Sequence, residues 1–131
     1  MPIYRNKLAN AFVPAPFVLT DITGLSPLTI QAGSSNYSFL ATLSVSGLTI
    51  PTLVPGWGLV FKIMQGNTVL GSYWMGDTNG GFRPSFSMTA VGDASATGIT
   101  EDISVKWMAF GVTAFLKEAA SFSIIYDDRL N

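Results

Sequence analysis

The feature that most constrains the fold is the alternation of apolar and hydroxyl-bearing residues between Tyr37 and Ser46. Apolar side chains occupy every second position from Tyr37 to Val45, and serine or threonine fills most positions between them. A period of two places the two sets on opposite faces of a β-strand. The segment therefore predicts a strand with one face in the core and a hydroxyl-bearing face outside it.

The same period recurs along the chain, so the prediction extends to an all-β domain. The further alternating segments are Phe17–Ile22, Trp57–Ile63, Val69–Met75, Phe82–Ala90, Ile103–Ala109, Val112–Leu116 and Ala120–Tyr126. Glycine- and proline-rich loops separate them, and no segment has a convincing helical period. About eight regularly spaced strands predict a single jelly-roll-like antiparallel β-sandwich over residues 17–131.

Two connections within this sandwich have distinct signals. Between Trp57 and Met75, the step Gly66-Asn67 separates two apolar runs, which predicts a tight hairpin. Residues 47–56 contain Pro51 and Pro55, which cannot lie inside a sheet, so this segment is predicted to be a long loop.

Residues 1–16 are predicted to form an extended arm outside the sandwich. Prolines exclude a helix, and the polar residues have no period. The residues expected to make partner contacts are Tyr4, Arg5, Lys7, Phe12, Pro14 and Pro16. Arg5 and Lys7 are only two charges, and no basic stripe follows them. We therefore expect the arm to bind protein, by adding a strand or lying in a groove, and not nucleic acid.

Charge is scarce in this chain and indicates an assembled state. Charged residues make up 11% of the sequence, against about 25% in an average soluble domain. Residues 22–61 carry no charge at all. Because a monomer needs a charged surface to stay dispersed, we expect much of this surface to be covered by copies of the chain or by a partner.

The absence of histidine and cysteine excludes several classes of site. It removes Ser-His-Asp and Cys-His catalysis, histidine or thiolate metal ligation and disulfides. The acidic pairs Glu101-Asp102 and Asp127-Asp128 could serve a hydrolase only if the fold brought one from each end together, because neighbours on a strand point to opposite faces. We expect solvated charges there, and neither an enzyme nor a cofactor.

A turn at 76–81 offers oxygen ligands in its Asp77-Thr78-Asn79-Gly80 sequence. Two oxygen-bearing side chains before a glycine begin some calcium loops. No Glu or Asp closes the loop at the distance that an EF-hand needs, so an Asx turn without a metal is the favoured interpretation.

The aromatic residues divide into core and surface candidates. Trp57 and Trp107 fall on the apolar phase of their strands and are predicted to be buried. Trp74 has the opposite phase from Tyr73, so one of the two is exposed or lies between subunits. The candidate oligomer interface comprises Tyr73, Trp74 and Phe110, because aromatics are enriched at interfaces. A sugar-stacking platform is the alternative.

No membrane association is expected. The segment after Arg5 and Lys7 is too short and too proline-broken for a secretory signal, and the uncharged run 22–61 contains prolines and glycines that exclude a membrane helix. An outer-membrane barrel, which also combines alternation with low charge, is the less favoured alternative.

Three segments resemble strands of the tumour-necrosis-factor and complement-C1q type of jelly roll: residues 57–63 (WGLVFKI), 100–107 (TEDISVKW) and 120–126 (ASFSIIY). The likeness covers residues 36–128, and Glu101-Asp102 departs from the Gly-Asp that often stands there. It implies a compact trimer with its inner strands along a threefold axis. Small cysteine-free domains with an extended N-terminal arm, such as this one, also resemble bacteriophage virion proteins.

The resemblance and the low charge together predict a structural virion protein. The favoured form is a homotrimeric capsid decoration or cement protein on the virion exterior, made in the host cytoplasm. It would bind the major capsid protein or another virion protein through its arm and trimer base. The alternative is the receptor-binding head of a phage tail fibre or spike that recognises a cell-surface glycan.

Overall fold

The computed structural model describes residues 3–13, 18–22, 24–25, 27–31, 37–78, 80–94 and 100–126. These residues form ten strands: β1 (Ile3–Val13), β2 (Thr20–Asp21), β3 (Leu28–Gln31), β4 (Tyr37–Val45), β5 (Leu48–Thr49), β6 (Gly58–Gln65), β7 (Thr68–Gly76), β8 (Phe86–Ala94), β9 (Thr100–Phe110) and β10 (Ala114–Tyr126). Within the same residues there is no helix of the length and apolar character needed to cross a membrane.

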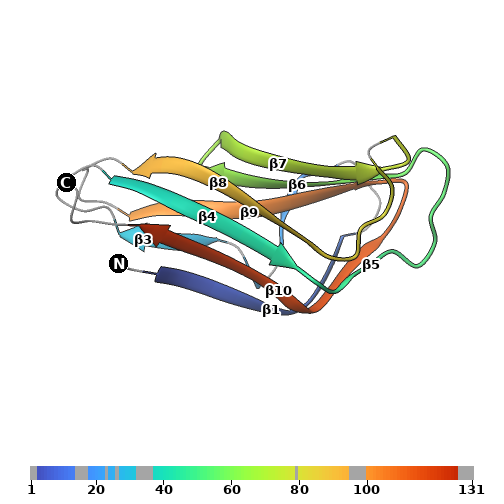
Figure 1. Ribbon diagram of the computed structural model, residues 1–131, viewed down its shortest axis with the longest axis horizontal. Coiled ribbons are helices and arrows are strands. Elements are labelled where there is room, and N and C mark those ends of the chain that lie inside the picture. Colours follow the sequence, from blue (N-terminus) through green and yellow to red (C-terminus); the bar gives the residue numbers. More distant parts are fainter. Residues whose placement is uncertain are drawn as a thin grey trace.

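The strands form two antiparallel sheets that lie over one another (Figure 1). The β4 sheet has the order β1-β10-β4-β8, with β5 also paired to β10. The β6 sheet has the order β2-β9-β6-β7, with β3 also paired to β9. The first long strand thus pairs with the last, β3 with β9, β4 with β8, and β6 with β7. An antiparallel ribbon wound in this way into two sheets is a jelly roll, which confirms the predicted fold class.

One hydrophobic core fills the space between the sheets. It takes the inward-facing residues of both, and its largest fully buried side chains include Phe61, Trp107 and Phe122. The ring of Phe61 lies 5.9 Å from that of Trp107 and 4.9 Å from that of Phe86, centroid to centroid. Trp57 is also buried, so both tryptophans predicted to lie in the core are confirmed there.

The alternation in β4 has the predicted result. Phe39, Ala41, Leu43 and Val45 are buried in the core, while the residues between them face outward. A slip of one residue would turn these apolar side chains outward, so the alternation determines which face of the strand packs on the core.

The hairpin between β6 and β7 also forms as predicted. Gln65 pairs with Thr68, which leaves Gly66 and Asn67 as a two-residue turn. Gly66 has a φ of 59°, and no described residue other than glycine has a positive φ, so the pair fits a type II′ turn.

The strand boundaries around Gly92 and β10 differ from the predictions. Residues 92–94, which follow the predicted segment Phe82–Ala90, continue β8. A Cβ at Gly92 would overlap the ring of Phe39, so packing explains this glycine. The predicted strands Val112–Leu116 and Ala120–Tyr126 are one continuous strand, β10, because β1 pairs along its length. The short strands β3 and β5 were not predicted.

The predicted N-terminal arm is wrong in its main feature. Residues 3–13 form β1, an edge strand paired with β10 from Ile3 opposite Ile125 to Val13 opposite Ala114, with one irregularity between Leu8 and Asn10. The backbone of β10 supplies the hydrogen-bond partners, so pairing needs no apolar period in β1. This segment therefore belongs to the sandwich.

Candidate binding surfaces

An aromatic cluster lies on the outer face of the β6 sheet. We call Trp74, Phe110, Val60 and Met108 the outer aromatic cluster. Val60 on β6 pairs with Trp74 on β7 and with Met108 on β9, so the three form one row across the sheet. The rings of Trp74 and Phe110 are nearly parallel, with an interplanar angle of 13° and centroids 6.1 Å apart. Trp74 is 45% exposed.

The outer aromatic cluster is a hydrophobic cluster separate from the core. Val60 has no exposed surface, although it does not belong to the core between the sheets. The ring of Phe110 lies against the backbone at Gly58, where an added Cβ would come within 3.2 Å of its Cδ2 atom. Burial of Val60 under neighbouring side chains makes this an ordered apolar surface.

Two lysines lie on the same face, one row along from Val60. Lys62 pairs with Ser72 on β7 and with Lys106 on β9. Lys106 Nζ is 3.9 Å from Asp21 Oδ1, and the two side chains are 30% and 49% exposed. No ion pair is found for Lys62 among the described residues. Like charges directly opposite one another repel, so this row favours an anion between the two ammonium groups.

The predicted interface residues do not all lie together. Tyr73 points to the inner side of β7, where its ring stacks on Phe86 at 4.2 Å with an interplanar angle of 9°. Trp74 and Phe110 face outward, as their opposite phase requires. Arg83 lies 5.0 Å from the Tyr73 ring and donates a hydrogen bond from Nη2 to the Trp74 carbonyl oxygen at 2.6 Å. No pattern in the sequence pointed to these contacts of Arg83.

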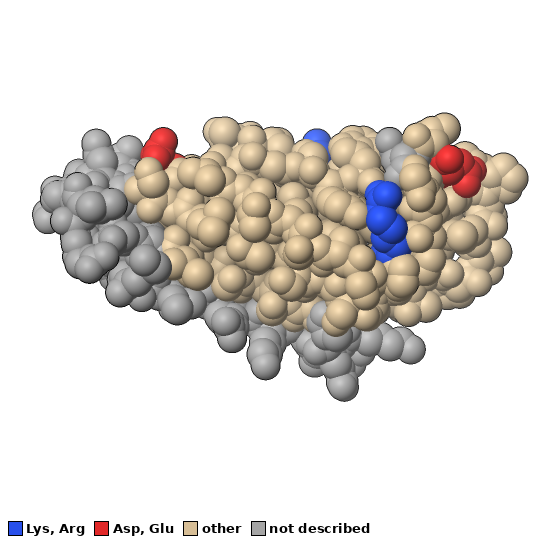
Figure 2. Space-filling view, in the orientation of Figure 1, with Lys and Arg blue, Asp and Glu red and all other residues tan. Residues whose placement is uncertain are grey.

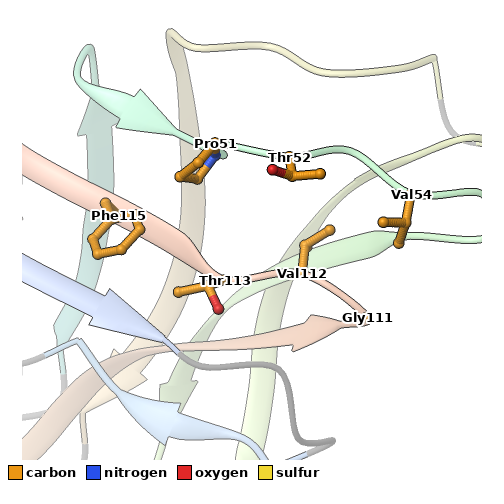
Figure 3. A pocket seen from close by; sticks show the side chains of 7 residues that line it. All are labelled: Pro51, Thr52, Val54, Gly111, Val112, Thr113 and Phe115. Atoms are coloured by element: carbon orange, nitrogen blue, oxygen red, sulfur yellow. The ribbon is translucent and has the colours of Figure 1, made fainter.

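A pocket of about 400 Å³ opens at one end of the sandwich (Figure 3). It lies between the connection that follows β5 and the turn from β9 to β10. Its lining residues are Pro51, Thr52, Val54, Gly111, Val112, Thr113 and Phe115, none of them charged. Val54 lies within 3.6 Å of a Cβ built at Gly111, the residue after Phe110, so the pocket adjoins the outer aromatic cluster. Sequence reasoning missed it because two loops distant in the chain form it.

The outer face of the β4 sheet has a different chemistry. One row is aliphatic, with Ile125, Leu40 and Val91 side by side on β10, β4 and β8. On these three strands the next two rows carry only hydroxyls: Ser123, Thr42 and Thr89, then Ser121, Ser44 and Ser87. The same two rows continue onto the edge strand β1 at Arg5 and Lys7. Figure 2 shows the molecule in the orientation of Figure 1, in which β4 and β8 cross the visible surface. Charged residues occupy only a few separate places on that surface.

Asp93 is the one charged residue in β4, β8 and residues 120–125 of β10. It lies near the end of β8, where its carboxylate accepts a hydrogen bond from the Ser38 hydroxyl at 2.7 Å. The middle of this face is therefore uncharged over three neighbouring strands.

The residues predicted for arm contacts lie on the edge of the β4 sheet or outside the described residues. Tyr4, Arg5, Lys7 and Phe12 are on β1, paired with Ile124, Ser123, Ser121 and Phe115 respectively. Pro14 and Pro16 lie outside the described residues. Binding of a partner by a free arm would require β1 to leave β10. The role of these residues in partner contacts stays a prediction.

The carboxylate of Asp77 binds a neighbouring loop. It accepts a hydrogen bond from the Gly56 backbone N–H, and Gly81 N–H donates to the Gly76 carbonyl at 2.9 Å. Asn79, the second ligand of the calcium hypothesis, lies outside the described residues. In the part of the chain that is described, no three acidic residues gather where a metal ion could bind.

One acidic pair, Glu101-Asp102, lies at the start of β9, and the other follows the last residue of β10 in the sequence. Asp102 accepts a hydrogen bond from Thr29 Oγ1 at 2.6 Å across β3 and β9. Asp127 and Asp128 lie outside the described residues. The carboxylate of Asp102 thus has a structural partner on its own sheet.

Comparison with known proteins gives structural neighbours only. No protein-family model and no curated protein sequence matches the chain. A subviral particle of VP2 from infectious bursal disease virus is similar with a TM-score of 0.43 and 10% identity, over 94% of this chain and 32% of VP2. This chain therefore spans about a third of the VP2 chain.

Carbohydrate-binding modules are also among the neighbours. The C-terminal CBM6 of LamC, a marine laminarinase from Zobellia galactanivorans, has a TM-score of 0.35 and 12% identity, over 94% of this chain and 98% of the module. A CBM36 solved with calcium and xylotriose has a TM-score of 0.29 and 8% identity, over 92% and 100% of the two chains. These values transfer none of the neighbours' properties to this chain, whose jelly roll follows from its own strand pairing.

Proposed function

We propose that the chain is a structural virion protein, a homotrimeric capsid decoration or cement protein that acts by binding and not by catalysis. The observation that carries the proposal is the uncharged middle of the outer face that β10, β4 and β8 form. Val91 is 67% exposed and Leu40 is 40% exposed in its aliphatic row. Exposed apolar residues in a contiguous, charge-free face mark a protein contact.

The charge-free face is large enough to form the centre of an interface between copies of the chain, with the edge strand β1 at its rim. β4 and β8 have nine residues each. With about 3.3 Å per residue and three strands about 4.8 Å apart, the charge-free face covers roughly 430 Å² before its side-chain relief is added. A standard interface buries about 800 Å² on each partner. The trimer implied by the sequence resemblance is therefore proposed to assemble through the β4 sheet.

The contact with the shell is assigned to the end of the sandwich in place of the arm. Leu53 and Val54 are 48% and 37% exposed beside the apolar pocket. A pocket without charged lining residues is suited to an apolar side chain from the shell protein. This end can contact a shell on the virion exterior while the β4 sheets face one another.

The test of this function is a measurement of mass followed by sedimentation with capsids. Light scattering is expected to give three times 14.0 kDa for the wild-type protein and one times that mass for Val91→Glu. The trimer is expected to sediment with capsids assembled from the major capsid protein that the same genome encodes. A wild-type monomer, or a trimer that stays in the supernatant, would contradict the proposal.

A second candidate is a receptor-binding head that recognises a glycan, favoured by the exposed ring of Trp74. Sugars present apolar faces that lie on aromatic rings. A glycan array separates the two candidates, because a decoration protein without receptor function shows no saturable sugar binding.

A further inference from the structure

We propose that the outer face of the β6 sheet is a binding site for an acidic sugar, whose ring lies on Trp74 while its carboxylate binds between Lys62 and Lys106. The site deepens the second candidate function and does not depend on trimer formation or capsid binding.

The sugar-stacking part of the site is a supported aromatic ring. Tryptophan is a mostly buried residue type, yet Trp74 is 45% exposed on an edge strand. Its ring is nearly parallel to that of Phe110, and the carbonyl oxygen of its residue accepts a hydrogen bond from Arg83. The stack on Phe110 orders the ring, and the hydrogen bond orders the backbone that carries it, which lowers the entropy cost of binding.

The cationic part of the site is one row away. Lys62 is two residues from Val60, the partner of Trp74, so it is diagonal to Trp74 across the sheet. Side chains in this relation have Cα atoms about 7–8 Å apart and remain within reach when they are aromatic or long. A carboxylate on a sugar ring stacked at Trp74 can therefore reach the ammonium groups of this row. Ser72, exposed between Trp74 and the turn, adds a hydroxyl.

The charge of the two lysines favours an anion over a neutral ligand. Lys106 is partly neutralised by Asp21, while Lys62 forms no ion pair within the described part of the chain. A bound carboxylate offsets the repulsion between the two ammonium groups and forms charge-assisted hydrogen bonds. A neutral sugar would gain only the contact with Trp74.

The same charges argue against nucleic acid. A single strand needs a positive groove that follows its phosphates over several nucleotides. Here two cations are followed on the same row by Asp21, and the chain has a net charge of -1. A single carboxylate fits this short row better than a chain of phosphates.

The positions of the three tryptophans allow ligand binding at Trp74 to be followed by fluorescence. Trp57 and Trp107 are 4% and 1% exposed, so Trp74 is the one tryptophan that a surface ligand can touch. We would titrate the full chain with sialyllactose, digalacturonic acid and neutral lactose, and follow both tryptophan fluorescence and the heat of binding. At least one acidic sugar is expected to bind saturably, with a fluorescence change and about tenfold more tightly than lactose.

Three variants locate the site. Trp74→Ala is expected to abolish the binding heat for acidic and neutral sugars alike. Lys62→Gln is expected to weaken the acidic sugar roughly three- to tenfold and leave lactose unchanged. The matched control is Lys62→Gln combined with Asn67→Lys, which restores the net charge at an exposed position in the β6–β7 turn and leaves the outer face of the β4 sheet unchanged. It should bind as weakly as Lys62→Gln alone.

Three results would overturn the proposal in distinguishable ways. If no sugar in the panel binds, both this site and the glycan-binding candidate fail. If lactose binds as tightly as the acidic sugars, or if Lys62→Gln has no effect, the acidic-sugar site fails while sugar binding stands. If single-stranded DNA competes at lower concentration than the sugars, the ligand is a nucleic acid. The mass and capsid-sedimentation tests are unaffected by each result.

Discussion

The two sheets of this jelly roll are alike on their inner faces and different on their outer ones. Both inner faces are apolar and packed into one core, to which the β6 sheet contributes Phe61 and the β4 sheet contributes Phe122. Outside, the β4 sheet presents aliphatic and hydroxyl rows without charge in the middle, while the β6 sheet presents an exposed tryptophan beside Lys62 and Lys106. The comparison shows that alternation fixes only one face of each strand, because the core constrains every second residue and leaves the others free for binding.

The largest expected effect concerns the edge of the β4 sheet. Deletion of residues 1–13 removes β1 and exposes the edge of β10 along its length. We expect the free energy of unfolding to fall by several kcal/mol, a large part of the 5–15 kcal/mol typical of a domain. Thermal unfolding followed by circular dichroism measures this loss. Deletion of residues 1–2 is the control, and an unchanged melting temperature in the longer deletion would restore the free-arm interpretation.

A second prediction compares the two faces of one strand. Phe61 and Val60 are adjacent on β6 and both have no exposed surface, but Phe61 faces the core and Val60 the outer aromatic cluster. Phe61→Ala is expected to cost about 3–5 kcal/mol, and Val60→Ala about 2 kcal/mol. Denaturant titration measures both.

The control for this pair is Val69→Ala on β7, which is 43% exposed in the wild type. Its cost should stay within about 0.5 kcal/mol. If Val60→Ala cost no more than Val69→Ala, the outer aromatic cluster would not be a packed unit.

These differences also show which parts of the molecule were predictable from sequence. The alternation in β4 and the Gly66-Asn67 turn are local signals, and the structure confirms both. The burial of Trp57 and Trp107 followed from phase alone. Each of these depends on which side of one strand a residue occupies, which the sequence states directly.

The remainder depends on contacts between distant segments. β1 was interpreted as an arm because an edge strand is held by the backbone of its neighbour and needs no apolar period. Gly92 was assigned to a loop, although its role is to make room for the ring of Phe39. The stack of Trp74 on Phe110 requires the registers of β7 and β9 on both sides of β6, which no single segment specifies.

A third, smaller effect is expected at the end of the sandwich. Asp77→Ala removes the acceptor of the Gly56 N–H and so releases the connection that lines the pocket. The expected cost is about 1 kcal/mol, with faster proteolysis of residues 51–56. Asp102→Ala, which removes an exposed carboxylate bonded to Thr29, is the matched control and should leave the proteolysis rate unchanged. Equal rates in all three proteins would show that Asp77 does not hold this loop.

The smallest effect on stability tests the charged row of the β6 sheet. Asp21 is 49% exposed and its oxygen lies 3.9 Å from Lys106 Nζ, so salt and water screen the pair. Asp21→Asn should change the free energy of unfolding by less than about 0.5 kcal/mol.

The same change leaves Lys106 without its carboxylate partner and is expected to strengthen acidic-sugar binding about twofold, with lactose unaffected. Ser87→Asn lies on the outer face of the opposite sheet and should alter neither quantity. Weaker acidic-sugar binding in Asp21→Asn would show that Asp21 orients Lys106 for the ligand and does not compete with it.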